Sequence, residues 1–338
     1  MNKKVLTSAL AVAFIFFNLA FGTPSLAHTS PPPSSAPPAD TLSFLPASDA
    51  VMVIDVRRLL NETLPRIFAS DAAKLAQVNS EIDNFKTRTG IDPRSFERVV
   101  VGARYIYPSA RVTRLETVAI AHGTFDARAL VAAARIAASG KYREEKYRGA
   151  TIMIFSINDQ MRPLGLWNMK VNELAVCALD AKTLAIGSLG NVRAAIETGR
   201  GGRRENNGLA LLANRDPNSV IGFGANVTRG LLANLNVGND AIAKDANSIR
   251  QVYGSIGSAQ NDVSLVLVAR AETAEAAKNL SDTVTGLKQL SALLIARMAP
   301  PRKALAQSAL DNLKITTRGN ELEIRTQFAA TSLAAVIK

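Results

Sequence analysis

One of the two histidines, His122, lies where an imidazole could take part in chemistry. It ends the apolar stretch 119–121 and precedes Gly123, so a strand end could display its side chain. A histidine acts as a general base when a nucleophile and an orienting carboxylate lie within hydrogen-bond reach. No serine stands in a nucleophile-elbow pattern to partner it, so His122 is a weak catalytic candidate and we expect it to be a hydrogen-bonded structural residue.

An acidic residue followed by two basic ones forms a second candidate group. Asp55 ends the apolar stretch 51–54, and Arg57 and Arg58 follow it. Such a group could bind an anionic ligand or orient a catalytic water. Asp55 is therefore a weak catalytic candidate, and Arg57 and Arg58 are weak ligand-binding candidates. The same residues more often cap a helix and form exposed ion pairs, which stabilise a protein little, and we expect that role.

The chain has one tryptophan and one cysteine. Trp167 is a weak binding candidate, since a loop aromatic could anchor a partner, although packing into the core is an equal alternative. Cys177 lies in the apolar run 174–179, which predicts a buried small hydrophobe because no base or positive field stands nearby to form a thiolate. A single cysteine also excludes a disulfide within the chain.

Residue spacing indicates neither a metal site nor a nucleotide cofactor. Zinc motifs need Cys-x-x-Cys or paired histidines, and neither pattern occurs. Residues 158–160 are too few for a calcium loop. Gly222 and Gly224 follow an apolar stretch, but the next glycine is Gly230, and this spacing does not fit a dinucleotide fingerprint. We therefore expect no metal and no cofactor.

The chain is strongly basic, with a formal net charge of +12. Such a charge favours encounters with anionic lipids, acidic envelope polymers or nucleic acid. The densest basic cluster, Gly199–Arg204, has no interleaved aromatic side chain on which bases could stack, so the sequence carries no specific nucleic-acid signature. We expect an anionic envelope component or a protein as partner, and the oligomeric state stays open.

Residues 1–27 have the three parts of a secretory signal peptide. Lys3 and Lys4 precede an apolar run over 5–21, and small residues stand at 25–27. The run is shorter than the roughly 20 residues that span a bilayer. We expect export to the periplasm or the extracellular space, transient membrane contact through the signal, and cleavage after Ala27, with a retained anchor as the alternative.

Composition and length divide the remainder of the chain. A tether rich in proline and serine covers 28–41, and the folded part is long enough for two lobes. We predict a first half over 42–198, a linker rich in glycine and arginine over 199–207, and a second half over 208–338. Hairpin-linked strands that alternate with helices favour an α+β fold, with mixed or antiparallel sheets and helices packed on one face.

The same order of elements recurs in the two predicted halves. A strand and helix over 218–235 match the first strand and helix of the first half, and a strand and helix over 262–293 match the strand at 116–122 and its helix. The hairpin over 313–328 corresponds to the hairpin over 173–188. This recurrence predicts two diverged repeats of similar topology.

The phrase Leu45-Pro46-Ala47-Ser48-Asp49-Ala50-Val51 begins the folded part, and the segments 90–94 and 98–102 follow it. In these segments the chain resembles a loose group of uncharacterised exported bacterial proteins that begin with a Leu-Pro-x-x-Asp-x-Val strand and helix. The resemblance covers about the first third of the mature chain. It implies a bacterial envelope setting and lends no catalytic residue.

Export, basic charge and recurrence together favour a non-catalytic envelope protein that binds a partner or ligand. A hydrolase or transferase that uses carboxylates with His122 is one alternative. A carrier of an apolar molecule is another, and it would need a sizeable apolar cavity. The sequence favours a binding protein and leaves the hydrolase or transferase and the carrier open as alternatives.

Overall fold

The computed structural model describes residues 41–109, 112–138, 140–156, 160–161, 169–170, 173–201, 207–228, 240–259 and 261–334. The signal, all but the last residue of the predicted tether, Trp167, most of the linker and most of the helix predicted over 228–235 lie outside these ranges. The chain forms two compact units. The first unit comprises the described parts of Ser34–Leu60 and Ala76–Asn207, and the second those of Asn61–Leu75 and Gly208–Lys338.

The first unit contains an antiparallel sheet with the strand order β1-β2-β3-β9-β8-β5-β4. Its strands are β1 (Ala50–Asp55), β2 (Phe96–Ser109), β3 (Val112–Gly123), β4 (Tyr142–Tyr147), β5 (Ala150–Ser156), β8 (Glu173–Ala178) and β9 (Thr183–Gly187). The short strands β6 (Gln160–Met161) and β7 (Met169–Lys170) pair with each other. Strands β1, β2 and β5 are rich in β-branched residues, which pack well on a pleated, covered surface.

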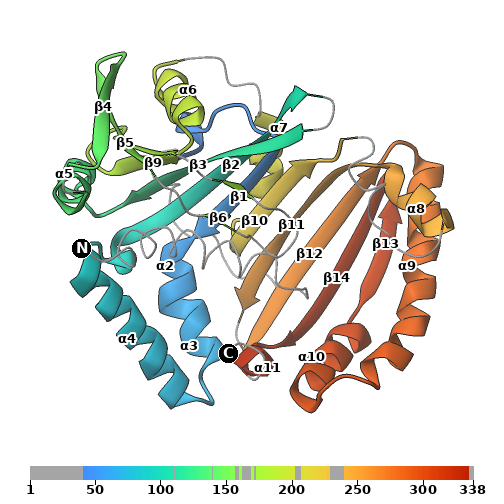
Figure 1. The fold of residues 1–338 in the computed structure, drawn as a ribbon. Coiled ribbons are helices and arrows are strands. Elements are labelled where there is room, and N and C mark those ends of the chain that lie inside the picture. Colours follow the sequence, from blue (N-terminus) through green and yellow to red (C-terminus); the bar gives the residue numbers. More distant parts are fainter. Residues whose placement is uncertain are drawn as a thin grey trace. The chain divides into compact units, whose positions relative to one another are not determined.

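Helices cover both faces of this sheet (Figure 1). Helix α6 (Leu189–Gly199) packs on the face that carries Ile152 and Ile154, and helix α5 (Ala127–Ala137) packs on the face that carries Met153 and Phe155. Successive side chains of a strand point to opposite faces, so one continuous apolar run serves two cores. The prediction that helices pack on one face is therefore wrong for this unit.

Local signals set the ends of the helical elements that precede β2 in the chain; of these, the stretch Asn61–Leu75 belongs to the second unit. These elements are η1 (Thr41–Phe44), α2 (Val56–Arg58), the π-helical η2 (Leu59–Thr63), α3 (Leu64–Ile67), α4 (Ala72–Thr89) and η3 (Pro93–Ser95). Pro65 stands in the first turn of α3, where its missing N–H costs nothing. Gly90 follows α4 with φ of 72°, a left-handed conformation that glycine adopts without strain.

The second unit contains an antiparallel sheet with the strand order β10-β11-β12-β14-β13. Its strands are β10 (Ser219–Asn226), β11 (Ile249–Ala259), β12 (Asp262–Ala271), β13 (Lys314–Arg318) and β14 (Glu321–Ala329). Its helices are α7 (Asn207–Ala213), α8 (Asp240–Asn247), α9 (Ala274–Ile295), α10 (Pro300–Asp311) and α11 (Ala330–Ala334). Leu280 of α9 packs with Ala269 and Leu322 of the sheet, so one sheet face is an apolar core.

The register of the second sheet aligns polar residues on its other face. Gln251 is opposite Arg270, and Arg270 is opposite Glu321. Directly paired residues of antiparallel strands share a face, so these three form a row across β11, β12 and β14. Tyr253 lies two residues after Gln251 in β11, and Glu323 lies two residues after Glu321 in β14, so both side chains point to this same face.

These sheets and helices confirm the α+β class. The order β1-β2-β3-β9-β8 in the first unit has the same sequence of connections as β10-β11-β12-β14-β13 in the second. Four of these five strand pairs, all except β2 with β11, correspond to matches predicted from the sequence. A common origin of the two halves nevertheless stays a prediction.

Candidate functional site

His122 is buried near the end of β3. Its Nδ1 atom lies 3.1 Å from the hydroxyl oxygen of Thr183, which stands opposite it in β9. Within the ranges that the structure describes, no ion pair joins His122 to a carboxylate. The imidazole is thus held by a neutral hydroxyl between two strands.

Asp55 is the N-cap of α2. Its Oδ1 accepts a hydrogen bond of 2.8 Å from the backbone N–H of Arg58. The Arg57 side chain is 67% exposed, and its guanidinium lies 4.0 Å from Glu97, a distance at which an exposed pair contributes little to stability. Asp55 therefore has the local role of capping the helix that follows β1. The side chains of Asp55, Arg57 and Arg58 do not converge on one point.

Cys177 is buried in β8 within the core next to α6. Burial disfavours the charged thiolate and raises the pKa of the thiol to about 11. The interpretation of this residue as a small core hydrophobe is confirmed.

We therefore expect the Cys177 thiol of the folded protein to resist 5,5′-dithiobis(2-nitrobenzoate) at pH 8. The raised pKa leaves little thiolate, and burial blocks access of the reagent. Unfolding in guanidinium chloride removes both effects, so one thiol per chain should then react within minutes. Rapid labelling of the native protein, with unchanged circular dichroism, would contradict the buried position.

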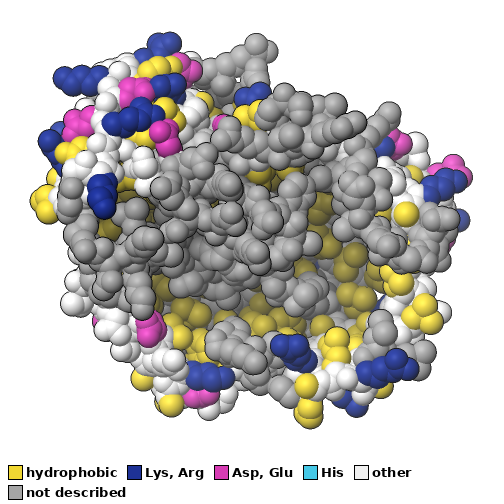
Figure 2. All heavy atoms as spheres, in the orientation of Figure 1, with side chains coloured by type: hydrophobic (Ala, Val, Ile, Leu, Met, Phe, Trp, Pro, Cys, Tyr) yellow, Lys and Arg dark blue, Asp and Glu magenta, His cyan; other side chains and the backbone are white. Residues whose placement is uncertain are grey.

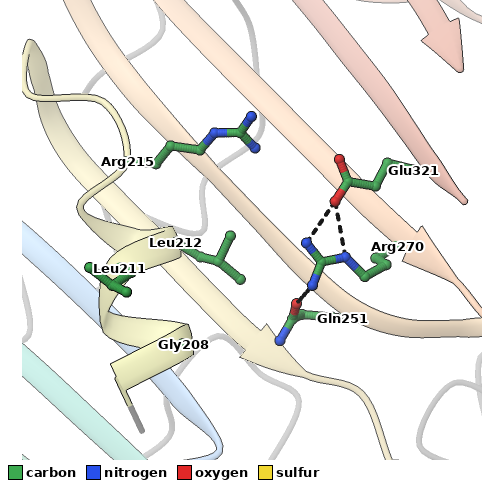
Figure 3. A pocket seen from close by; sticks show the side chains of 7 residues that line it. All are labelled: Gly208, Leu211, Leu212, Arg215, Gln251, Arg270 and Glu321. Carbon is green, nitrogen blue, oxygen red and sulfur yellow. Dashed lines mark hydrogen bonds and ion pairs between the residues drawn. The ribbon is translucent and has the colours of Figure 1, made fainter. Parts of the chain in front are cut away.

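A pocket of about 550 Å³ lies in the second unit, beside the polar row of its sheet (Figure 3). Residues of α7, of the turn after it and of three strands line it: Gly208, Leu211, Leu212, Arg215, Gln251, Arg270 and Glu321. Helix α7 lies close on β10, because a Cβ at Gly222 would meet the carbonyl oxygen of Ala213. This close approach brings the leucines of α7 to the edge of the polar row.

Arg270 is fixed at the centre of the polar row. Its Nε and Nη2 donate to Glu321 Oε1 at 2.9 and 2.7 Å, and its Nη1 donates to Gln251 Oε1 at 2.6 Å. Burial opposes ionisation of Glu321, but hydrogen bonds from Arg270 and Tyr253 hold the pKa of this carboxyl below its usual value. The pair is therefore charged at neutral pH, and the two formal charges compensate each other.

Tyr253 lies against both arginines of the pocket. The guanidinium carbons of Arg215 and Arg270 each lie 5.6 Å from the centroid of its ring, a cation–π distance. Arg215 Nη1 also donates to the phenol oxygen at 2.9 Å. Burial and the neighbouring Glu321 raise the pKa of the phenol, against the effect of the two guanidiniums. The phenol is thus protonated at neutral pH and works as a hydrogen-bonding support.

Sequence analysis missed Arg215, Tyr253, Arg270 and Glu321. The only local signal is polar residues at alternating positions of strands whose other residues are apolar, as in β14. The four residues come from four segments of the chain: the strand register places Tyr253, Arg270 and Glu321 on one face, and Arg215 comes from the turn after α7. The chemistry that this arrangement offers is recognition of a ligand through guanidinium, amide and leucine groups.

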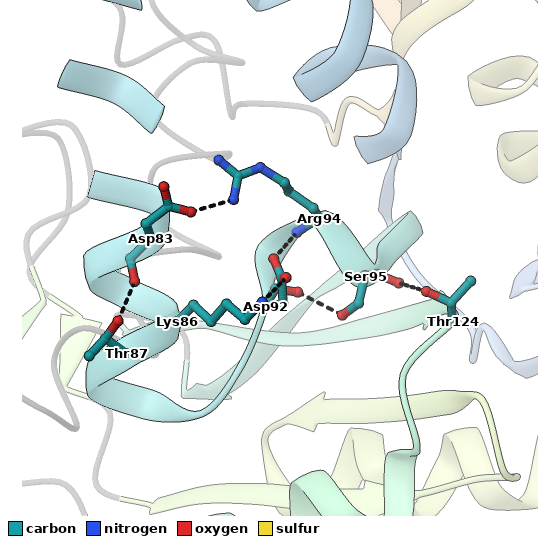
Figure 4. Close-up of polar contacts among 7 residues, drawn as sticks. All are labelled: Asp83, Lys86, Thr87, Asp92, Arg94, Ser95 and Thr124. Carbon is teal, nitrogen blue, oxygen red and sulfur yellow. Dashed lines mark hydrogen bonds and ion pairs between the residues drawn. The ribbon is translucent and has the colours of Figure 1, made fainter. Parts of the chain in front are cut away.

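A second polar cluster lies in the first unit, where α4 meets β2 (Figure 4). Arg94 pairs with Asp83 at 2.6 Å, and Lys86 pairs with Asp92 at 2.9 Å. Burial opposes ionisation of Asp92, but Lys86 and the backbone N–H of Arg94 hold its pKa below the usual value. Ser95 donates to the carbonyl of Asp92 and accepts from Thr124. These bonds fasten the turn after α4, which is a structural role.

Charged side chains of the first unit are interspersed by sign around α5, β4 and α6 (Figure 2). Arg193 pairs with Glu145 at 2.5 Å, and Arg143 pairs with Glu173 at 2.9 Å. Paired surface charges produce a weaker long-range field than a patch of one sign. This part of the surface therefore does not concentrate the basic charge of the chain.

Within the described residues, no three side chains among histidine, cysteine, aspartate and glutamate converge to hold a metal ion. No helix of the described part is both long and apolar enough to cross a bilayer.

Comparisons with family models and with curated proteins found no match. Among solved structures, crystal form III of TP0453 is similar with a TM-score of 0.46 and 12% identity, over 89% of this chain and 98% of that one. Crystal form IV of TP0453 gives a TM-score of 0.45 at 12% identity, over 88% of this chain and 96% of that one. The likeness concerns the fold alone.

Proposed function

We propose that the chain is an exported, non-catalytic binding protein, and that the pocket of the second unit is where it binds its ligand. The observation that carries this proposal is the convergence of Arg215, Gln251 and Arg270 with two leucines around one space of about 550 Å³. Small-molecule sites are typically concave and combine apolar walls with a few placed polar groups, in volumes of about 300–1,000 Å³.

The protonation states of the pocket support binding rather than proton transfer. A general base should have a pKa near the working pH. The pKa of Tyr253 is raised from that of an ordinary phenol, and the pKa of Glu321 is lowered from that of an ordinary carboxyl, so both move away from neutrality. The arginines stay protonated at every physiological pH. These groups therefore suit permanent hydrogen bonding and charge recognition.

The amino-terminal pattern supports export. Lys3 and Lys4, the apolar run and Ala27 form a signal of the secretory type. The cell envelope is rich in anionic components, and a basic mature protein is attracted to them at low ionic strength. Both features agree with a pocket whose lining carries two arginines and one glutamate.

Fractionation of bacteria that express the full chain with a carboxy-terminal tag tests the export part. We expect the periplasmic or secreted fraction to contain a shortened protein that begins at His28, as identified by amino-terminal sequencing. A variant with both Lys3→Glu and Lys4→Glu should be exported less, because the signal loses its positive start. A cytosolic, full-length protein would overturn export.

Native mass spectrometry tests the binding part. We expect the exported protein to retain a small molecule whose release restores the mass of the bare chain. An Asp55→Asn variant should retain the same molecule, because Asp55 lies on β1 of the first unit and outside the pocket. If the natural protein shows a hydrolase or transferase activity that a folded His122→Asn variant lacks, the result would instead support that alternative.

A further inference from the structure

We infer that the pocket takes a small carboxylate that carries an aliphatic chain, with the carboxylate on Arg215 and the chain against Leu212 and Leu211. This inference rests on the proposed function and names its ligand class. It follows from three features: a guanidinium that is not engaged in a salt bridge, a rigid support for it, and an adjacent apolar wall.

Arg215 is the pocket arginine that no salt bridge holds within the described residues, although Glu321 and Glu323 lie close enough to feel its charge. Arg270 is occupied by Glu321 and Gln251, so its charge is already matched. Arg215 donates a hydrogen bond to the neutral phenol of Tyr253, and among the residues that the structure describes no carboxylate forms a salt bridge with it. A guanidinium has five N–H donors, so most of those on Arg215 remain for a ligand.

Tyr253 holds this guanidinium in place. The ring lies under Arg215 at a cation–π distance, and the phenol oxygen accepts from Nη1. Tyr253 itself is only 1% exposed, so its ring cannot swing away. A planar guanidinium that is fixed in this way can bind a carboxylate through two parallel hydrogen bonds with little loss of conformational entropy.

The apolar wall comes from α7. Leu211 lines the pocket and is 69% exposed, so its side chain offers apolar surface to a ligand. Leu212 points from α7 toward Gln251 and Arg270 (Figure 3). An aliphatic chain placed here would remove leucine surface from water, which favours binding. A ligand with a charged head and an apolar chain therefore matches the pocket better than an inorganic ion does.

The net charge of the lining selects a monoanion. Two arginines and one glutamate leave one positive charge, which one carboxylate neutralises. A phosphate dianion would bring excess negative charge next to Glu321, and like charges at short range repel. The preferred head group is therefore a carboxylate and not a phosphate.

Isothermal titration calorimetry on the mature protein tests the inference with octanoate, octan-1-ol, acetate and inorganic phosphate. We expect octanoate to bind more tightly than each of the other three, because only octanoate offers both a single charge and a chain. Arg215→Gln should weaken octanoate binding at least about tenfold, the size of a lost charged hydrogen bond. Arg302→Gln, which removes an exposed arginine of α10 outside the pocket, should leave it unchanged.

Arg215→Lys keeps the positive charge but lacks the planar guanidinium with its paired donors. Its affinity for octanoate should therefore lie between those of the natural protein and of Arg215→Gln. Arg215→Lys also serves as the second variant if Arg215→Gln does not fold, as judged by thermal melting. Equal binding of octanoate and octan-1-ol, or binding unaffected in both Arg215 variants, would overturn the carboxylate inference and leave pocket binding standing. Tight binding of phosphate, or no binding of octanoate, would also overturn it. Failure of the proposed function itself appears separately, in fractionation and native mass spectrometry.

Discussion

Gly222→Ala is expected to destabilise the protein by about 3 kcal/mol or more and to disorder the pocket at the same time. A Cβ on Gly222 would lie 1.8 Å from the carbonyl oxygen of Ala213, which is backbone at the end of α7 and cannot rotate away. Helix α7 must then move from β10, and it carries Leu211 and Leu212 with it. The measurement is the free energy of unfolding in urea, followed by circular dichroism.

Gly286→Ala is the matched control for this prediction. Gly286 lies in the middle of α9, and apart from the local backbone of its own helix a Cβ there would meet no atom within 4 Å. Alanine is a better helix former than glycine by up to about 1 kcal/mol, so this variant should be slightly more stable than the natural protein. If Gly222→Ala were as stable as Gly286→Ala, the close packing of α7 on β10 would be wrong.

The class of the fold could be predicted from the sequence because its signals are local. Hairpin turns and β-branched runs indicate antiparallel strands wherever they occur, and Asp55 stands directly before the helix that it caps. The burial of Cys177 followed from its apolar neighbours in the same strand. Each of these inferences uses residues within a few positions of one another.

The candidate site could not be predicted because its signals are not local. Arg215 follows a helix, Tyr253 and Arg270 lie on adjacent strands, and Glu321 begins β14. Each residue alone looks like an ordinary surface charge or a core aromatic. Only the register that aligns Gln251, Arg270 and Glu321 shows that they share a face.

The two-sided packing of the first sheet was missed for a related reason. The residues of β5 from Ile152 to Phe155 form an unbroken apolar run, which is typical of a strand covered on both faces. A run of that length also fits a strand at the edge of one large core. Helices α5 and α6 pack on opposite faces, which shows that β5 is covered on both sides. The placement of helices depends on contacts between segments that are distant in the sequence.

Ile154→Ala is expected to lower the free energy of unfolding by about 2–5 kcal/mol, because it removes buried methyl groups and leaves a cavity. Ile154 is 1% exposed on the face under α6. By contrast, Ile136 of α5 is 79% exposed, and its replacement by alanine should change stability by less than about 0.5 kcal/mol.

The Met153→Ala variant distinguishes two-sided from one-sided packing of β5. Met153 is 2% exposed on the opposite face, so it should also cost at least about 2 kcal/mol in the same urea titration. A loss as small as that of Ile136→Ala would mean that only one face of β5 is covered.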